Sequence, residues 1–231
     1  MVADRDSSLL KRVNVDGTEA VCRLALRLGI KRMIYLSSVA VISGNPQSPL
    51  TDDLPYSATN LYGASKIEAE KTVLRYRQAG LPVAILRPSM VYGEGEPHLQ
   101  SLLFRLLCRR LLVLPDQGRA KMHLAYVGTV VQAMLLALRS DAMLEGTFLT
   151  ADEDVLTMRE VFAAFAEGLS VPGPALLPRG LTPFLLRVPV IGKRLAWTLK
   201  DRIYDICRLR SAGLSARGGG TREYLAGTAR A

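Results

Sequence analysis

Tyr62 and Lys66 are the residues whose types and spacing most directly suggest chemistry. They stand four positions apart, at the two ends of the segment YGASK, and side chains four apart on a helix share one face. A nearby ammonium group favours the phenolate and lowers the pKa of a tyrosine, so this pair predicts Tyr62 as a general acid and base. The same spacing also occurs in exposed helical pairs without a function, and the surrounding sequence decides between the two interpretations.

Small polar residues end two short apolar segments on either side of this pair. Residues 32–38 end in two serines, the second of which is Ser38, and residues 82–86 lie just before Ser89. Buried segments of this length between helical patterns are typical of parallel strands, whose carboxyl ends open onto the ligand crevice of an α/β sheet. We therefore expect the Ser38 hydroxyl, the Tyr62 phenol and the second strand end to converge on one site.

The positions of apolar residues predict the elements that must hold this site. Helical spacing recurs in five segments, and short apolar runs between them predict strands. The expected helices are residues 9–28, 59–78, 99–110, 127–139 and 158–169, and the expected strands are residues 32–38, 82–86, 112–114 and 146–150. This alternation of helix and strand implies a right-handed parallel α/β layer.

The composition changes after this alternating region. Residues 171–183 contain four prolines and two glycines, which predicts a linker, and a basic helical stretch is expected at residues 184–209. The last twenty residues have few large apolar side chains and are expected to be disordered. We therefore divide the chain into a partial Rossmann-like domain with the catalytic motif at 1–170, a helical substrate-lobe segment at 171–210 and a disordered tail at 211–231.

Charge and cysteine content narrow the class of protein. The 231 residues carry a formal net charge of +9 at pH 7; residues 1–178 hold 19 Lys and Arg against 18 Asp and Glu, and residues 179–231 hold 11 against 3. A basic carboxyl-terminal stretch is typical of solvated surface and also fits peripheral contact with an anionic membrane, whereas no nucleic-acid partner is predicted. Three widely spaced cysteines and two histidines predict neither a disulfide framework nor a metal site, and they favour the cytoplasm.

Together with the segment NVDGT at residues 14–18, these motifs resemble the extended short-chain dehydrogenase/reductase family, which contains nucleotide-sugar epimerases and dehydratases and 3β-hydroxysteroid dehydrogenases. The resemblance extends from about Val13 to Leu138. It implies an α/β fold with a partial Rossmann-type parallel sheet, flanking helices and a small C-terminal substrate lobe. It also implies hydride transfer at a secondary alcohol or ketone. The substrate would be a small molecule, either a 3β-hydroxysteroid-like alcohol or a nucleotide sugar, and the cofactor would be NAD or NADP.

The resemblance also assigns roles to individual residues. Tyr62 would exchange a proton with the substrate oxygen, Lys66 would bind the nicotinamide ribose and lower the pKa of Tyr62, and Ser38 would hydrogen-bond the reacting oxygen. These three residues form the implied catalytic set. The implied cofactor-binding set is Asn14, Ser37, Tyr62, Lys66, Pro88 and Ser89.

One motif of the family is not found in these residues. Its members hold the cofactor pyrophosphate on a glycine-rich turn, whereas the nearest pattern here, residues 93–98, has the first two glycines and two carboxylates. The first strands of the family's sheet would lie before Met1, which would leave the strand at 32–38 as an open edge. Two hypotheses remain: an NAD(P)-dependent oxidoreductase or epimerase, or a truncated, inactive member that acts at most as a binding or dimerisation module. The resemblance further implies a homodimer or completion by a missing N-terminal segment.

Overall fold

The computed structural model describes residues 7–95, 100–182, 187, 198–215 and 220–230. The chain forms two compact units, and each unit is built from three segments of the sequence. The first unit comprises Met1–Ser89, Gly128–Ala151 and Tyr204–Ser215, and the second comprises Met90–Val127, Asp152–Ile203 and Ala216–Ala231. All residues of the implied catalytic and cofactor-binding sets lie in the first unit.

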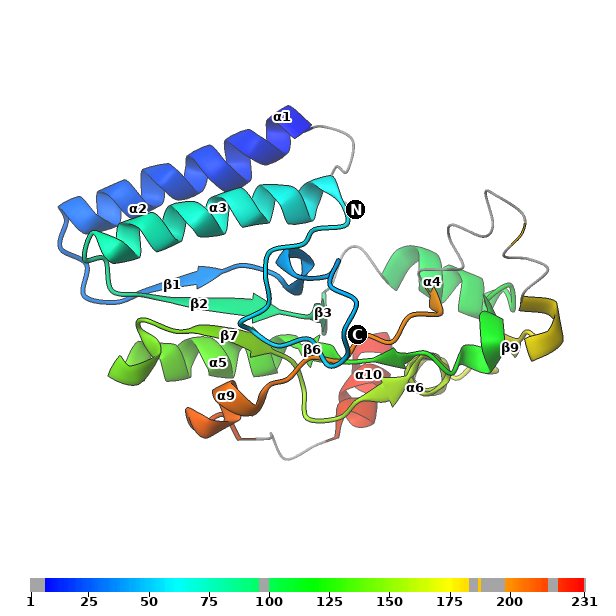
Figure 1. The fold of residues 1–231 in the computed structure, drawn as a ribbon. Helices are drawn as coiled ribbons and strands as arrows, with labels where there is room; N and C mark the ends of the chain where they lie inside the picture. Colours follow the sequence, from blue (N-terminus) through cyan, green and yellow to red (C-terminus); the bar gives the residue numbers. More distant parts are fainter. Residues whose placement is uncertain (1–6, 96–99, 183–186, 188–197, 216–219, 231) are drawn as a thin grey trace. The chain divides into compact units, whose positions relative to one another are not determined.

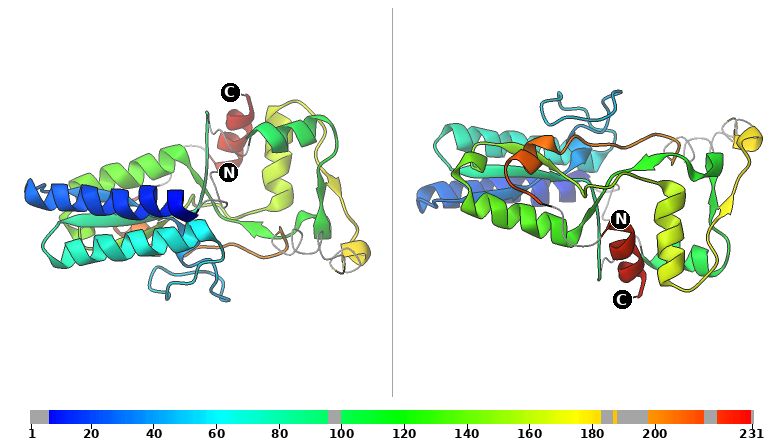
Figure 2. Two further views of the ribbon diagram at one scale, coloured as in Figure 1. Left: turned by 90° about the horizontal axis from the view of Figure 1, so that it is seen from above. Right: turned by 90° about the horizontal axis from the view of Figure 1, so that it is seen from below.

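The first unit contains a three-stranded parallel sheet in the order β1-β2-β7. Its strands are β1 (Met33–Leu36), β2 (Val83–Pro88) and β7 (Thr147–Thr150). Helices α2 (Gly17–Arg27) and α3 (Leu61–Gln78) cover one face of this sheet, and α5 (Val127–Arg139) and α9 (Cys207–Ser211) cover the other (Figure 1 and Figure 2). The fold is therefore a partial Rossmann-type sheet with flanking helices, which confirms the α/β prediction.

The sequence of β2 explains why helices cover both faces. All of its residues are buried, and side chains of successive residues point to opposite faces. Val83 and Ile85 pack in a cluster with Val73 of α3, whereas Leu86 packs in another with Ala133 of α5. A strand that is buried on both faces needs a continuous apolar sequence rather than an alternating one.

Strand β1 forms an edge of this sheet. Among the described residues it pairs with β2 alone, in parallel register from Met33 opposite Val83 to Leu36 opposite Leu86. Leu36 is more than one-third exposed. The open edge expected for this strand is therefore present in the part of the chain that the structure describes.

The first predicted helix is confirmed, but it is not a regular α-helix. It consists of α1 (Ser7–Leu10), the π-helical segment η1 (Lys11–Asp16) and α2, and the Gly17 N–H donates to the Arg12 carbonyl instead of to a carbonyl four residues back. A π-helical segment fits an additional residue into the turn and is frequent at functional sites. Here it contains Asn14, one of the implied cofactor-binding residues.

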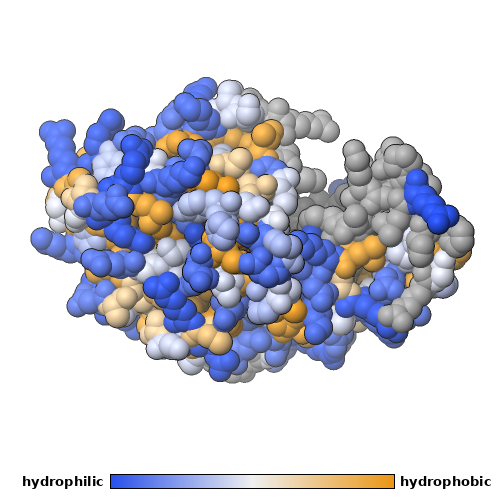
Figure 3. Space-filling view, viewed as in Figure 1, coloured by the Kyte–Doolittle hydropathy of each residue, from blue (hydrophilic) through white to orange (hydrophobic). Residues whose placement is uncertain are grey.

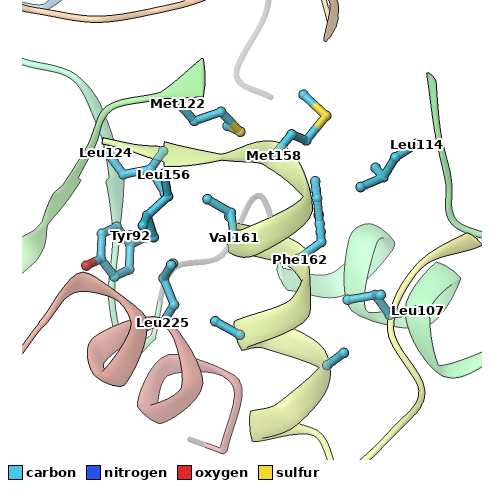
Figure 4. Close-up of a cluster of buried hydrophobic side chains, with 12 residues drawn as sticks. Tyr92, Leu107, Leu114, Met122, Leu124, Leu156, Met158, Val161, Phe162 and Leu225 are labelled. Atoms are coloured by element: carbon cyan, nitrogen blue, oxygen red, sulfur yellow. The ribbon is translucent and has the colours of Figure 1, made fainter. Parts of the chain in front are cut away.

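In the residues that the structure describes, the second unit contains short strand pairs and three α-helices. The pairs are β3 (Met90–Tyr92) with β6 (Leu124–Tyr126), β4 (Val113–Leu114) with β9 (Ala175–Leu176), and β5 (Lys121–Met122) with β8 (Leu156–Thr157). The helices are α4 (Gln100–Cys108), α6 (Met158–Gly168) and α10 (Thr221–Arg230). Val161 and Phe162 of α6 pack in one apolar cluster with Leu124 of β6 and Leu225 of α10 (Figure 4).

The remaining described elements are short helical turns. They are η2 (Val39–Val41), η3 (Pro115–Gly118), η4 (Asp141–Met143) and η5 (Arg179–Leu181). Within the described residues, no helix combines the length and the apolar character needed to cross a bilayer.

Two expectations for the carboxyl-terminal part are wrong. Residues 221–230, expected to be disordered, form α10. This helix is stabilised because Leu225 is fully buried against α6 and because Gly168 of α6 lets the backbone of α10 approach closely. A Cβ at Gly168 would lie 2.2 Å from the Ala226 carbonyl oxygen, so only glycine allows this approach. The predicted linker at 171–183 contributes β9, which pairs with β4.

Half of the basic stretch expected to be helical at residues 184–209 lies outside the described residues. The expectation is wrong for residues 200–206, which are not helical, because Arg202 and Tyr204 form isolated β-bridges with Met122 and Leu50. The described end of this stretch includes Tyr204 and the start of α9, which belong to the first unit. The proposed division into a Rossmann-like domain, a substrate lobe and a tail therefore stays a prediction, apart from the helix at 221–230.

Helix α6 begins with a complete capping box. The Thr157 hydroxyl accepts from the Glu160 N–H, and the Glu160 carboxylate accepts from the Thr157 N–H at 2.8 Å. The Thr157 hydroxyl also donates to this carboxylate at 2.9 Å, and the two bonds that the carboxylate accepts from Thr157 lower the pKa of Glu160. The stabilisation that they give is therefore present above the pKa of the unfolded carboxyl and is lost as the pH falls through the lower folded-state pKa.

Replacing Thr157 with alanine is expected to lower the free energy of unfolding by about 0.5–2 kcal/mol, because the Glu160 N–H loses its side-chain acceptor. Urea denaturation followed by circular dichroism measures this change. Ser140→Ala is the matched control, since Ser140 precedes η4 without making a side-chain capping bond. Equal losses in the two variants would contradict the assigned capping role.

Candidate active site

Ser38 and Tyr62 come together at the carboxyl end of β1. Tyr62 lies in the first turn of α3, a helix that begins after Asn60, whose side chain accepts from the Gly63 N–H at 2.7 Å. Ser38 follows β1 and caps η2, and its hydroxyl oxygen accepts from the Ala40 N–H at 3.2 Å. The Ser38 hydroxyl also lies near the Tyr62 phenol, where it acts to lower the pKa of that phenol. The predicted convergence of hydroxyl and phenol is thus present in the structure.

Lys66 lies one turn after Tyr62 on the same helix. Its Nζ donates to the Leu36 carbonyl oxygen at 3.0 Å and lies 5.4 Å from the centre of the Tyr35 ring. Helix α3 therefore presents the phenol and the ammonium toward the end of the same strand, as their spacing predicted. The Leu36 carbonyl is the last of β1, so the ammonium also satisfies a backbone acceptor at the open edge.

The pKa of Tyr62 does not follow the sequence-based expectation. Burial of the phenol raises this pKa above its ordinary value, and the nearby Ser38 hydroxyl opposes that shift. Lys66 was expected to lower the pKa of Tyr62, but its ammonium is bonded to Leu36 and its own pKa is lowered by burial. The expected net lowering for Tyr62 is therefore wrong for this structure, and Ser38 is the group that favours the phenolate.

Asn14 is linked to Tyr62 through Ser65. The Asn14 Nδ2 donates to the Ser65 hydroxyl at 2.9 Å, and that hydroxyl donates to the Tyr62 carbonyl at 2.8 Å. The Thr18 hydroxyl holds the Asn14 carbonyl at 2.6 Å. These bonds join the π-helical segment to the turn of α3 that carries Tyr62, so Asn14 contributes to the geometry of the site.

Ser37 lies in a different environment from Ser38. Its hydroxyl is buried and donates at 2.5 Å to Glu70, which also forms a buried ion pair with Arg87. This contact favours Ser38 as the hydroxyl that meets a substrate. The role of Ser37 in cofactor binding stays a prediction.

Glu70 was missed by the sequence analysis. It lies four residues after Lys66 and eight after Tyr62, on the same side of α3, and this spacing is the signal that could have identified it. Its side chain is fully buried, which is rare for glutamate unless it is paired.

Pro88 and Ser89 lie at the carboxyl end of β2, as predicted. The Ser89 N–H donates to the Thr150 carbonyl at 2.9 Å, which places the ends of β2 and β7 side by side. The hydroxyls of Ser89 and Thr150 are both buried, and neither has a hydrogen-bond partner among the described residues.

The glycine turn after β3 is a poor phosphate site. Gly95 has a φ of +77°, but the intervening Glu94 carries a carboxylate that accepts from the Tyr126 hydroxyl at 3.1 Å. A negative charge at this position would repel a pyrophosphate. The glycine turn at Gly93 and Gly95 therefore does not fit a cofactor pyrophosphate.

Comparison with known proteins agrees with this geometry. The family model described as the NAD dependent epimerase/dehydratase family matches residues 3–149, which is more than half of the chain. The chain belongs to the NAD-dependent epimerase/dehydratase family. The matched segment includes all the residues of the predicted catalytic and cofactor-binding sets.

Two similar proteins share less than a third of the aligned residues with the chain. The N-acetyl-alpha-D-glucosaminyl-diphospho-ditrans,octacis-undecaprenol 4-epimerase of Escherichia coli O157:H7 is 29% identical over 174 residues, 74% of this chain and 52% of that protein. Methionine adenosyltransferase 2 subunit beta of Bos taurus is 27% identical over 222 residues, 94% of this chain and 62% of that protein. The chain spans about half the length of the first of these relatives and less than two-thirds of the second.

A solved structure confirms the fold. The UDP-glucuronic acid 4-epimerase of Bacillus cereus, crystallised with NAD, superposes with a TM-score of 0.74 at 14% identity, and the match covers 92% of this chain and 65% of that one. At this identity the likeness establishes the Rossmann-type fold and not the substrate.

Removing the Ser38 hydroxyl is expected to raise the pKa of Tyr62 further, because the group that opposes the effect of burial is lost. In Ser38→Ala, turnover at neutral pH should fall about 10²-fold, since the donor to the reacting oxygen is lost too. Carbon-13 NMR of labelled tyrosine, titrated with pH, measures the pKa directly. Ser43→Ala, which alters a neighbouring hydroxyl bonded to the Ala40 carbonyl at 3.1 Å, should change neither quantity. An unchanged Tyr62 pKa in Ser38→Ala would contradict the assignment.

Proposed function

We propose that this chain supplies the acid–base residues of a nicotinamide-dependent oxidoreductase or epimerase, which acts at a secondary alcohol or ketone of a small molecule. The observation that carries the proposal is that Ser38 and Tyr62 lie together at a parallel strand end, with Lys66 one turn away on the same helix. The family membership supports this reaction class. A nucleotide sugar and a 3β-hydroxysteroid-like alcohol are both kept as substrate classes, because solved structures of similar fold contain UDP-sugars and one relative is named as a 3β-hydroxysteroid dehydrogenase.

In this proposal, Tyr62 transfers the proton and Ser38 stabilises the charge on the reacting oxygen. The Tyr62 phenolate takes the proton from the substrate hydroxyl during oxidation, and the phenol returns a proton to the carbonyl oxygen during reduction. The Ser38 hydroxyl donates to the reacting oxygen and disperses the charge that develops on it. When bound, the nicotinamide supplies a site that accepts and returns the hydride. Lys66, Tyr62, Asn14, Ser37, Pro88 and Ser89 would hold that end of NAD or NADP.

Calorimetric titration of the chain with NAD⁺, NADH and NADP⁺ tests the cofactor part of the proposal. Binding that is lost in Lys66→Met and retained in Lys71→Met would support it, because both lysines lie on α3 and Lys71 instead pairs with Glu68. Turnover of a panel of UDP-sugars and hydroxysteroids then identifies the substrate class. No binding of any nicotinamide by the folded chain, or by the chain with a supplied N-terminal segment of a relative, would overturn the proposal.

A second candidate is a non-catalytic binding or dimerisation module. One relative that matches along 94% of this chain is named as a subunit of an adenosyltransferase rather than as an epimerase. The first helical segment also exposes large apolar side chains, and Figure 3 shows apolar groups between hydrophilic ones on the face viewed there. The exposed apolar residues of the first helical segment include Val13, Val21, Leu24 and Leu28, and each is more than half exposed.

We propose that this helix forms a homodimer contact together with α3. Sedimentation equilibrium of the wild type and of Leu24→Glu measures the mass, and a monomer in both would contradict the contact.

The basic segment at 179–231 is proposed to touch anionic membranes peripherally, which co-sedimentation with phosphatidylserine vesicles tests. A cytoplasmic location is supported by three free cysteines, of which Cys108 and Cys207 are exposed.

A further inference from the structure

Glu70 is the centre of a buried polar cluster beside the candidate catalytic residues. Arg87 Nε donates to both carboxylate oxygens, at 3.1 and 3.2 Å, and its Nη2 also donates to Oε1. The Tyr56 hydroxyl donates to Oε1 at 2.9 Å, and the Ser37 hydroxyl donates to Oε2 at 2.5 Å. Both carboxylate oxygens of Glu70 thus accept hydrogen bonds from side chains of the first unit.

The cluster ties together four segments that surround the site. Glu70 belongs to α3, Arg87 to β2, Ser37 to the end of β1, and Tyr56 to the loop before α3. Arg87 extends the connection through Nη1, which donates to the Asp52 carbonyl at 2.8 Å. Because Ser37 directly precedes Ser38, the bond to Glu70 fixes the backbone that carries the candidate catalytic hydroxyl relative to the helix that carries Tyr62.

Glu70 also acts on Lys66 through its charge. Burial lowers the pKa of Lys66, and the Glu70 carboxylate, one helical turn further on, raises it again. The other titratable groups near the ammonium are the phenols of Tyr35, from β1, and Tyr62, from α3 itself. Glu70 is thus the anionic group among these neighbours that favours a charged Lys66.

We propose that Glu70, held in place by Arg87, is a positioning residue that sets Ser38 and Lys66 for proton transfer at Tyr62. This inference rests on the proposed function and deepens it. A helix can place Tyr62 and Lys66 by spacing alone, but Ser38 comes from a different segment and needs a tertiary link to be held at the phenol. The bond from Ser37 to Glu70 is the buried side-chain link of that kind in the described residues.

Two substitutions separate the two effects of Glu70. Ser37→Ala removes the link to the strand end and leaves the ion pair with Arg87 intact. Glu70→Gln keeps the size of the side chain and one oxygen acceptor, and it removes the negative charge. Glu68→Gln is the matched control, because Glu68 lies two residues away on α3, is exposed and pairs with Lys71 at 2.9 Å.

The expected results differ between the variants. Ser37→Ala should lower kcat about 10- to 100-fold with little change in the KM of the substrate alcohol or ketone, because the reacting groups are misplaced while the groups that bind this substrate are retained. Glu70→Gln should lower the pKa of Lys66, measured by NMR of isotope-labelled lysine side chains, and shift the pH–rate profile. Lys66→Arg assigns the NMR signal by deleting it. Glu68→Gln should change none of these quantities.

The NMR measurement needs no cofactor and keeps the inference testable apart from the proposed function. If the wild type binds no nicotinamide and turns over no substrate, the proposed function fails, whatever the NMR result. If the wild type is active and Ser37→Ala retains full kcat, or if Glu70→Gln leaves the pKa of Lys66 unchanged, the positioning role is overturned. If Glu70→Gln does not fold, the kcat of Ser37→Ala decides the positioning role by itself, because that variant keeps the ion pair of Glu70 with Arg87.

Discussion

Replacing Tyr62 with phenylalanine is expected to lower turnover by about 10²- to 10⁴-fold, because the ring stays in place while the group that exchanges the proton is removed. The affinity for NAD should change much less than turnover, since the proposed ribose contact of Lys66 is kept. Steady-state kinetics on the substrate found in the panel, together with calorimetric titration of the cofactor, measure both quantities. The neighbouring Ser38 hydroxyl is also held by the Ala40 N–H, so the local backbone should remain in place.

Tyr76→Phe is the matched control for this prediction. Tyr76 lies near the end of the same helix, and its hydroxyl donates to Glu19 at 2.6 Å, away from the strand end that carries Ser38. Its loss removes a phenolic hydroxyl from α3 without touching the proposed proton path. Turnover that falls equally in both variants would show that the effect comes from the helix rather than from acid–base chemistry.

Replacing Arg87 with methionine should destabilise the fold by about 3–5 kcal/mol, because the Glu70 carboxylate would be left buried without its ion-pair partner. The side chains of Arg87 and Glu70 are 5% and 0% exposed, so water cannot replace the lost donor without local opening. Guanidinium denaturation followed by circular dichroism measures the free energy of unfolding. A loss below about 1 kcal/mol would be the size expected for a surface pair and would contradict the burial of this one.

Two further variants test the physical origin of that loss. Lys71→Met removes one partner of the exposed Lys71–Glu68 pair on the same helix and should cost no more than about 0.5 kcal/mol. Adding Glu70→Met to Arg87→Met should recover most of the stability, since two apolar side chains of similar length then fill the site of the two charges. The stability of the double variant would be restored without restoring turnover, because the bond to Ser37 is also lost.

Much of the first unit could be predicted from local sequence. Helices near α2, α3 and α5 and strands near β1, β2 and β7 follow from the spacing of apolar residues, because burial on one or both faces of an element imposes a period on its sequence. The continuous run VAIL of β2 predicted a strand covered on both faces, and the clusters on its two sides show this directly. The same periodicity placed Tyr62 and Lys66 on one face of a helix.

The second unit was less predictable, because its elements are stabilised by partners distant in sequence. β4 and β9 have two residues each and form only because they pair across more than fifty residues of chain. Helix α10 has a weakly apolar sequence that resembles a solvated tail, and its burial depends on the small residue Gly168 on α6. Such contacts between distant residues cannot be predicted from the local sequence.

The sequence by itself determined the α/β class, the strand ends and the identity of Ser38, Tyr62 and Lys66 as candidates, because period and spacing are local properties. The tertiary structure decided which groups these residues meet and how their proton affinities change. It showed that Ser38, and not Lys66, favours the Tyr62 phenolate, and that Ser37 is bound by a buried Glu70. Burial and hydrogen bonding depend on every segment packed around a group, so their balance appears only once the chain is folded.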